Sequence, residues 1–287
     1  MIDGLRVIDA HQHLWDLETG EYSWLTPEAG AIYRSFQVED AEPLVAASGV
    51  DDIVLVQAAG NLADTRAMIG AADRWERVVG IVAWAPLTDE AATAQVLEEY
   101  ATDRRIVGVR HQNHDEPDPD WLVRADVARG LARVEQAGLS YDVIAVVPRH
   151  LELVPVLAER FPELRLVIDH LAKPPLAAGD LREWEASLRR AAAYPQVTAK
   201  VSGLDTAAAP GYTAADLRPA LDIALECFGA ERLMFGTDWP VSVLGGGYAR
   251  WWEVLCELLE PLTTEERAAI LADTAAAVYR ITQEVPA

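Results

Sequence analysis

The segment RVIDAHQH, residues 6–13, begins as an apolar strand and ends in two histidines that are one residue apart. Side chains alternate between the two faces of a strand, so His11 and His13 are expected to point to the same side. Short apolar segments of this kind recur along the chain and alternate with amphipathic helical segments. That alternation is typical of parallel βαβ units.

Eight such strands are predicted, and most are continuously apolar, as expected for strands that are covered on both faces. Their ranges are 6–10, 52–57, 78–84, 106–111, 139–147, 164–170, 197–203 and 232–238. Helices are predicted over 62–74, 90–102, 122–136, 151–161, 181–193, 215–228 and 264–279. No Gly-rich turn follows the first strand, which argues against an open dinucleotide-binding sheet. The pattern predicts an α/β fold with a single (β/α)₈ TIM barrel domain over residues 1–287.

Composition limits the classes of partner. The chain has 287 residues, 51% of them hydrophobic and 24% charged, which is the balance of a globular protein. Its net charge of −22 disfavours binding to nucleic acid. We find no signal-like start and no apolar run of about 20 residues, and therefore expect a cytoplasmic protein without a membrane span. The two cysteines predict no disulfide framework, and a homo-oligomer remains compatible with the sequence.

Polar residues lie at the ends of the sixth and eighth predicted strands, as they do at the end of the first. Asp169 and His170 end the sixth strand, and Asp238 ends the eighth. The carboxyl ends of barrel strands share one rim, where the reacting groups of such enzymes lie. The four side chains His11, His13, His170 and Asp238 are therefore expected to form one catalytic site.

Five segments of the chain, including these strand ends, resemble segments of a known enzyme superfamily. IDAHQH (8–13), VRH (109–111), IDHLAKP (168–174), FGTDWP (235–240) and DTAAAVY (273–279) resemble the amidohydrolase superfamily, and within it the branch of sugar-lactone hydrolases. The resemblance extends over nearly the whole chain. It implies an amidohydrolase-type barrel and the hydrolysis of a sugar (aldono-)lactone, a small-molecule substrate, to the aldonic acid.

The resemblance also indicates which residues could bind a metal ion. Metal-dependent members hold their ion with the histidine pair of the first strand, a histidine on the fifth, sometimes one on the sixth, and the aspartate of the eighth. The fifth strand of this chain has no histidine, and His150 is expected to start the helix that follows. His11, His13 and Asp238 remain as three ligands, enough for zinc but one fewer than the pattern. We expect no required cofactor and allow one divalent cation such as zinc.

The expected mechanism starts from Asp238, which takes a proton from the water that attacks the lactone carbonyl. His11, His13 or Arg110 stabilises the oxyanion, and His170 protonates the departing ring oxygen. Further residues are expected to bind the substrate. They are one of the neighbours Arg110 and His111, the tryptophans Trp24, Trp84 and Trp239, and Lys200, which either enters the site or pairs with an acid.

Three other functions fit the same pattern. Two use the same fold: a metal-dependent decarboxylase, which needs a tightly held ion, and a pyrone-dicarboxylate lactonase, which needs several arginines in the cleft. The third is a non-catalytic barrel that binds a sugar acid, which would not need Asp238 and His170 at one rim.

Overall fold

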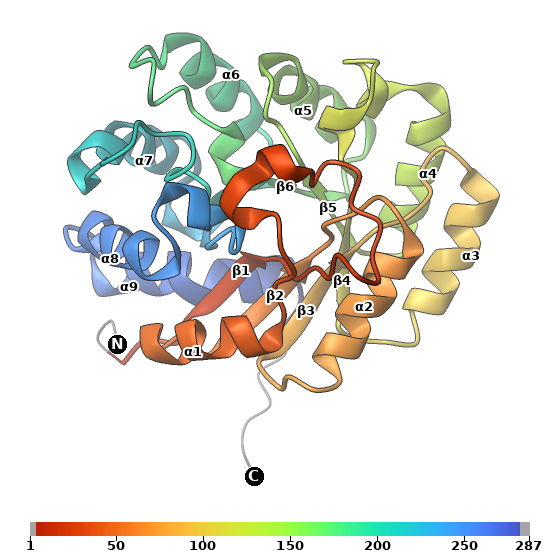
Figure 1. Cartoon of the computed structure of the whole chain (residues 1–287). Coiled ribbons are helices and arrows are strands. Elements are labelled where there is room, and N and C mark those ends of the chain that lie inside the picture. Colours follow the sequence, from red (N-terminus) through yellow and green to blue (C-terminus); the bar gives the residue numbers. More distant parts are fainter. Residues whose placement is uncertain (1–3, 282–287) are drawn as a thin grey trace.

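The structure, a computed structural model, describes residues 4–281 and contains eight parallel strands that follow the order of the chain around one sheet (Figure 1). The strands are β1 (Ile8–Gln12), β2 (Asp52–Val56), β3 (Val78–Ala83), β4 (Ile106–Arg110), β5 (Ser140–Val143), β6 (Arg165–Ile168), β7 (Val197–Val201) and β8 (Leu233–Phe235). The sheet closes beyond β8, where Trp239 pairs with Gln12 in parallel. The main-chain N–H of His13 donates to the Trp239 carbonyl at 2.7 Å. The predicted (β/α)₈ barrel is therefore confirmed.

Helices surround the strands on the outside of the barrel (Figure 1). They are α1 (Val38–Ser48), α2 (Leu62–Ala72), α3 (Glu90–Tyr100), α4 (Ala125–Gln136), α5 (Pro148–Arg160), α6 (Arg182–Ala192), α7 (Ala214–Phe228), α8 (Tyr248–Leu259), α9 (Thr264–Ala268) and α10 (Thr274–Val278). Side-chain caps set several of these starts, for example Asn61, which accepts from the Asp64 N–H ahead of α2. None of the helices in residues 4–281 is long and apolar enough to cross a membrane.

The predicted helices and strands lie within a few residues of the observed ones, with three differences. The predicted ranges did not include α1 and α8; α1 carries Pro43 in its interior, which obscures the helical pattern. The predicted fifth strand extends to residue 147, whereas β5 ends at Val143. The predicted last helix is interrupted by a π-helical turn, Ala269–Asp273, between α9 and α10.

Two apolar cores result from the alternation of side chains along the strands. One set of strand residues packs against the outer helices. The alternate set, including Ile8, Val54 and Met234, forms a separate cluster that Tyr279 joins from the end of α10. Helix α4 packs closely on the β3–α3 connection: a Cβ at Gly130 would lie 2.3 Å from the Leu87 carbonyl oxygen. Both cysteines, Cys227 and Cys256, are free thiols.

Candidate active site

The histidine pair of β1 lies at the rim, buried, with both rings on one side of the strand. The Nε2 atoms of His11 and His13 are 3.1 Å apart. His13 Nδ1 donates a hydrogen bond to the Val56 carbonyl oxygen, which can only accept, at 2.7 Å. Burial lowers the pKa of His11 well below its ordinary value, so this imidazole is neutral.

Asp238 follows β8 and lies among three histidines. Its Oδ1 is 3.4 Å from His13 Nε2 and 3.7 Å from His11 Nε2, and its Oδ2 is 3.8 Å from His170 Nε2. Burial acts to raise the pKa of this carboxyl group, but interactions with the surrounding histidines and with Lys173 lower it below its ordinary value. Asp238 therefore remains an ionised carboxylate at neutral pH.

His170 belongs to an unusual turn after β6. Four consecutive non-glycine residues, from His170 to Lys173, have positive φ angles between 48° and 59°. The Trp184 indole holds this turn by donating to the Leu171 carbonyl at 2.7 Å. His170 Nδ1 is 2.8 Å from Ser202 Oγ. Burial lowers the pKa of His170 to about 4, so its ring is also neutral at neutral pH.

Lys173, at the end of the same turn, is a site residue that sequence reasoning did not assign. Its Nζ is 3.9 Å from Asp238 Oδ2 and donates to Thr206 Oγ1 at 2.6 Å. The sequence did contain a signal for this residue. Only two of the 24 lysine and arginine residues in the chain are lysines, and both of them, Lys173 and Lys200, lie in or directly after a predicted strand.

Of the neighbours Arg110 and His111, the structure turns Arg110 toward the site. Its Nη1 donates to Asp169 Oδ2 at 2.9 Å and lies 3.2 Å from His11 Nε2. His111 points away: its Nε2 is 2.8 Å from Glu116 Oε1, and its ring stacks on Trp121 at 4.1 Å.

The three tryptophans predicted to bind substrate differ in position. Trp24 lines the cavity at the rim, and its Nε1 donates to the Ala58 carbonyl at 2.7 Å. Trp84 donates its N–H to His111 Nδ1 at 3.2 Å, outside that cavity. Trp239 is only 2% exposed and packs against Phe36. The structure thus brings Trp24 to the site but not Trp84 or Trp239.

The cavity at the rim has a volume of about 190 Å³. Five of the predicted catalytic and binding side chains, including Trp24, line it together with Lys173 and His114. The full lining is His13, Trp24, Ala58, Arg110, Gln112, His114, Ile144, Val146, His170, Lys173, Asp238 and Val241.

Lys200 lies beneath this cavity with no exposed surface. Its Nζ donates to Asp142 Oδ2 at 2.6 Å, and lies 3.1 Å both from Asp169 Oδ1 and from His11 Nδ1. The Tyr279 hydroxyl donates to the same Asp142 oxygen at 2.7 Å. Of the two alternatives left open by the sequence, the structure has Lys200 paired with acids. Asp142, on β5, was not identified from the sequence.

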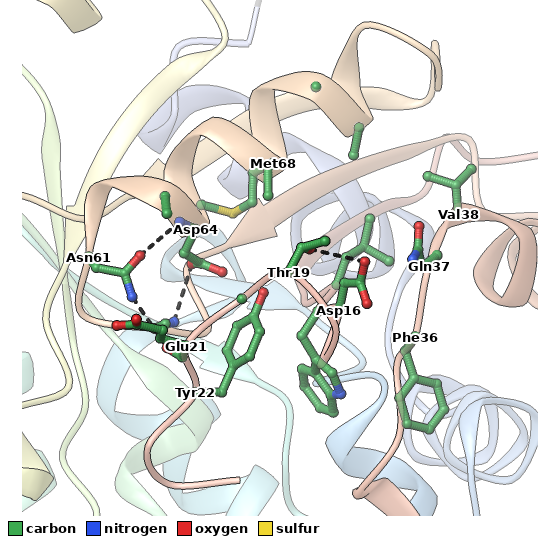
Figure 2. A pocket seen from close by; sticks show the side chains of 18 of the residues that line it. Asp16, Thr19, Glu21, Tyr22, Phe36, Gln37, Val38, Asn61, Asp64 and Met68 are labelled. Atoms are coloured by element: carbon green, nitrogen blue, oxygen red, sulfur yellow. Dashed lines mark hydrogen bonds between the residues drawn. The ribbon is translucent and has the colours of Figure 1, made fainter.

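A larger cavity of about 370 Å³ lies between α2 and the segment that follows β1 (Figure 2). Asp64 and Tyr22 both line it, and the Tyr22 hydroxyl points toward the Asp64 carboxylate. Asp64 Oδ2 accepts the main-chain N–H groups of Ala58 and Ala59. None of the strand-end histidines lines this cavity, so the chemistry of the molecule is placed in the smaller one.

The residues at the rim fit a divalent cation. His11, His13 and Asp238 bring ligand atoms to within 4.8 Å of one another. Ligands about 2.0–2.1 Å from a tetrahedral zinc ion lie about 3.3 Å apart, close to the 3.1 and 3.4 Å found for the His11–His13 and His13–Asp238 pairs. His13 Nε2 lies 3.4 Å from the ionised Asp238 carboxylate, and a cation bound at this rim would offset that negative charge.

Comparison with known proteins agrees with this geometry. An amidohydrolase family model matches residues 8–281. Two proteins named L-fucono-1,5-lactonase are each 36% identical to the chain: one from Burkholderia ambifaria, covering 96% of this chain and 95% of that protein, and one from Burkholderia multivorans, covering 98% of both.

Among solved structures, an amidohydrolase from Burkholderia multivorans with bound zinc is 35% identical, with a TM-score of 0.88 over 96% of this chain and 100% of that one. The family match, the sequence identity and the shared barrel agree with one another. This chain belongs to the amidohydrolase family.

Proposed function

We propose that the protein hydrolyses a sugar lactone, an aldonolactone, to the corresponding aldonic acid. The names of its two relatives at 36% identity support this substrate class. The observation that carries the chemistry is the ionised Asp238 carboxylate, which lies within 3.4–3.8 Å of three imidazoles at the edge of the cavity.

Asp238 acts as the base. A water molecule next to its carboxylate gives up a proton to it while the water oxygen forms a bond to the lactone carbonyl carbon. The carbonyl electrons move to the oxygen and produce a tetrahedral oxyanion. When they return, the bond from carbon to ring oxygen breaks, and the departing alkoxide receives the proton that Asp238 took. The product is the open hydroxy acid.

Neutral and cationic donors stabilise this intermediate. Arg110 lines the cavity, with its Nη1 3.2 Å from His11 Nε2, and we assign its guanidinium a hydrogen bond to the carbonyl oxygen. His170, with its pKa of about 4, meets the substrate as a neutral imidazole. We therefore assign His170 a hydrogen bond to the ring oxygen, in place of the proton transfer expected from the sequence.

A divalent cation, if one is bound, would be held by His11, His13 and Asp238 and would polarise the carbonyl as a Lewis acid. The zinc in the related Burkholderia multivorans structure supports such binding. Arg110 and Lys173 supply positive charge at the same cavity in any case. We propose that the cation is optional for hydrolysis.

The lining favours a neutral, hydroxylated ring over the alternatives. A dicarboxylate would call for several arginines, and within the described chain the cavity has Arg110 as its single arginine. Trp24 offers an indole surface of the kind that stacks on a sugar ring. A barrel that only binds a sugar acid would have no use for a carboxylate held ionised beside the ligand.

The test is a pH-indicator assay with a panel of L- and D-aldonolactones, with and without chelator, alongside elemental analysis of the purified protein. We expect acid release from at least one lactone and activity that survives chelation. Loss of activity on chelation and its return with zinc would overturn the optional role of the cation. Saturable binding without product, followed by NMR, would indicate a non-catalytic barrel.

A further inference from the structure

We propose that the Lys200 ammonium group permanently occupies a second cation position at the centre of this barrel, so that the protein holds at most one divalent ion. The number of ions bound does not depend on the proposed lactone hydrolysis. It follows from the positions of Lys200, His11 and Asp169.

Two sets of three side chains in the described part of the chain are close enough to hold an ion, and both include His11. The first set is the rim group described above, which His11 enters through Nε2. The second set is His11, Asp169 and His170, all buried. His11 faces Asp169 through its other nitrogen, with Nδ1 3.2 Å from Asp169 Oδ1. The two positions therefore lie on opposite edges of one imidazole ring.

The second position is already filled by a positive charge. Lys200 Nζ lies 3.1 Å from both Asp169 Oδ1 and His11 Nδ1, the two atoms that face each other there. A third contact, to Asp142 Oδ2 at 2.6 Å, fixes the ammonium from β5. Lys200 and these partners are fully buried, so water does not compete for the contacts.

Charge balance favours an ammonium group at this position. The buried carboxylates Asp142 and Asp169 face two cations, Lys200 and Arg110. A divalent ion at the second position would lie against the ammonium and leave the group with excess positive charge. Without the ammonium, two carboxylates would face one arginine, and the buried group would have excess negative charge. Such a group binds a metal ion more favourably.

The test counts bound metal. Wild-type protein and two variants, Lys200→Met and Lys200→Gln, are equilibrated with excess zinc, freed of unbound metal, and measured by elemental analysis. Methionine and glutamine are uncharged and leave Asp142 and Asp169 in place, and glutamine can still donate a hydrogen bond to Asp142, which gives a second variant if Lys200→Met does not fold. The other lysine of the chain gives the matched control, Lys173→Met, which leaves the second position filled.

We expect the wild type and Lys173→Met to bind at most one zinc per chain and the Lys200 variants to bind one more than the wild type. A zinc-dependent rise in melting temperature should exceed that of the wild type in the same variants. Two zinc ions in the wild type, or no gain in either Lys200 variant, would overturn the inference. Neither result depends on finding a lactone substrate.

Discussion

The neutral state of His170 has a measurable effect on stability. Burial lowers its pKa from 6.5 to about 4, so between these values the unfolded chain takes up a proton that the folded protein refuses. Since the folded pKa is the lower one, the stabilisation is complete above pH 6.5 and is lost as the pH falls toward 4. Each pKa unit between the unfolded and folded states corresponds to about 1.4 kcal/mol. Between pH 7 and pH 5 the free energy of unfolding therefore falls by about 2 kcal/mol.

The comparison that isolates this loss is with His170→Gln, which cannot titrate but keeps a polar group beside Ser202. Unfolding by denaturant at pH 7 and pH 5 should show the wild type losing about 2 kcal/mol more than the variant. Asp9 and Asp205, whose pKa values burial raises to about 6 and about 7, act in the opposite direction in both proteins and cancel. Equal losses, together with an NMR titration of His170 near pH 6.5, would refute the neutral imidazole.

Three further substitutions test other parts of the molecule. Asp238→Asn should lower kcat about a hundredfold or more in the lactone assay while circular dichroism stays unchanged, and near-normal turnover would exclude Asp238 as the base. Arg110→Lys keeps the charge but loses the planar fork that holds Asp169, and we expect kcat/KM to fall about tenfold; a change below twofold would contradict that role. Gly130→Ala places a Cβ against the Leu87 carbonyl and should lower the free energy of unfolding by about 1–3 kcal/mol, measured by denaturant titration; an unchanged value would mean that the backbone yields there.

The fold could be predicted because its signal is local. Apolar strands that alternate with amphipathic helices need no long-range information, and the polar ends of the strands identify the rim. The choice between Arg110 and His111 could not be made this way, because strand alternation allows either one to point inward. Asp169, 59 residues away and directly after the next-but-one strand, decides it by accepting a hydrogen bond from Arg110.

The aromatic residues show a second limit of sequence reasoning. Trp24, Trp84 and Trp239 all lie in loops or at strand ends, which is why all three were expected in the site. Which indole reaches a cavity depends on contacts that the local sequence does not specify, such as the His111 ring that accepts from Trp84 or the Phe36 ring that packs on Trp239. Lys173 depends on a left-handed turn without glycine, which has no sequence pattern of its own.

That turn also shows how the barrel maintains its site. A non-glycine residue in the left-handed region costs about 1–2 kcal/mol, and His170 to Lys173 and Asp238 all adopt it. Contacts from other elements offset this cost: Trp184 of α6 holds Leu171, and Lys173 donates to the Gly203 carbonyl beyond β7. Gly203 must itself lack a side chain, since a Cβ there would lie 2.8 Å from His170 Nδ1. The relative positions of His170 and Asp238 therefore depend on residues outside the cavity, and substitutions at α6 or after β7 should alter catalysis without contacting substrate.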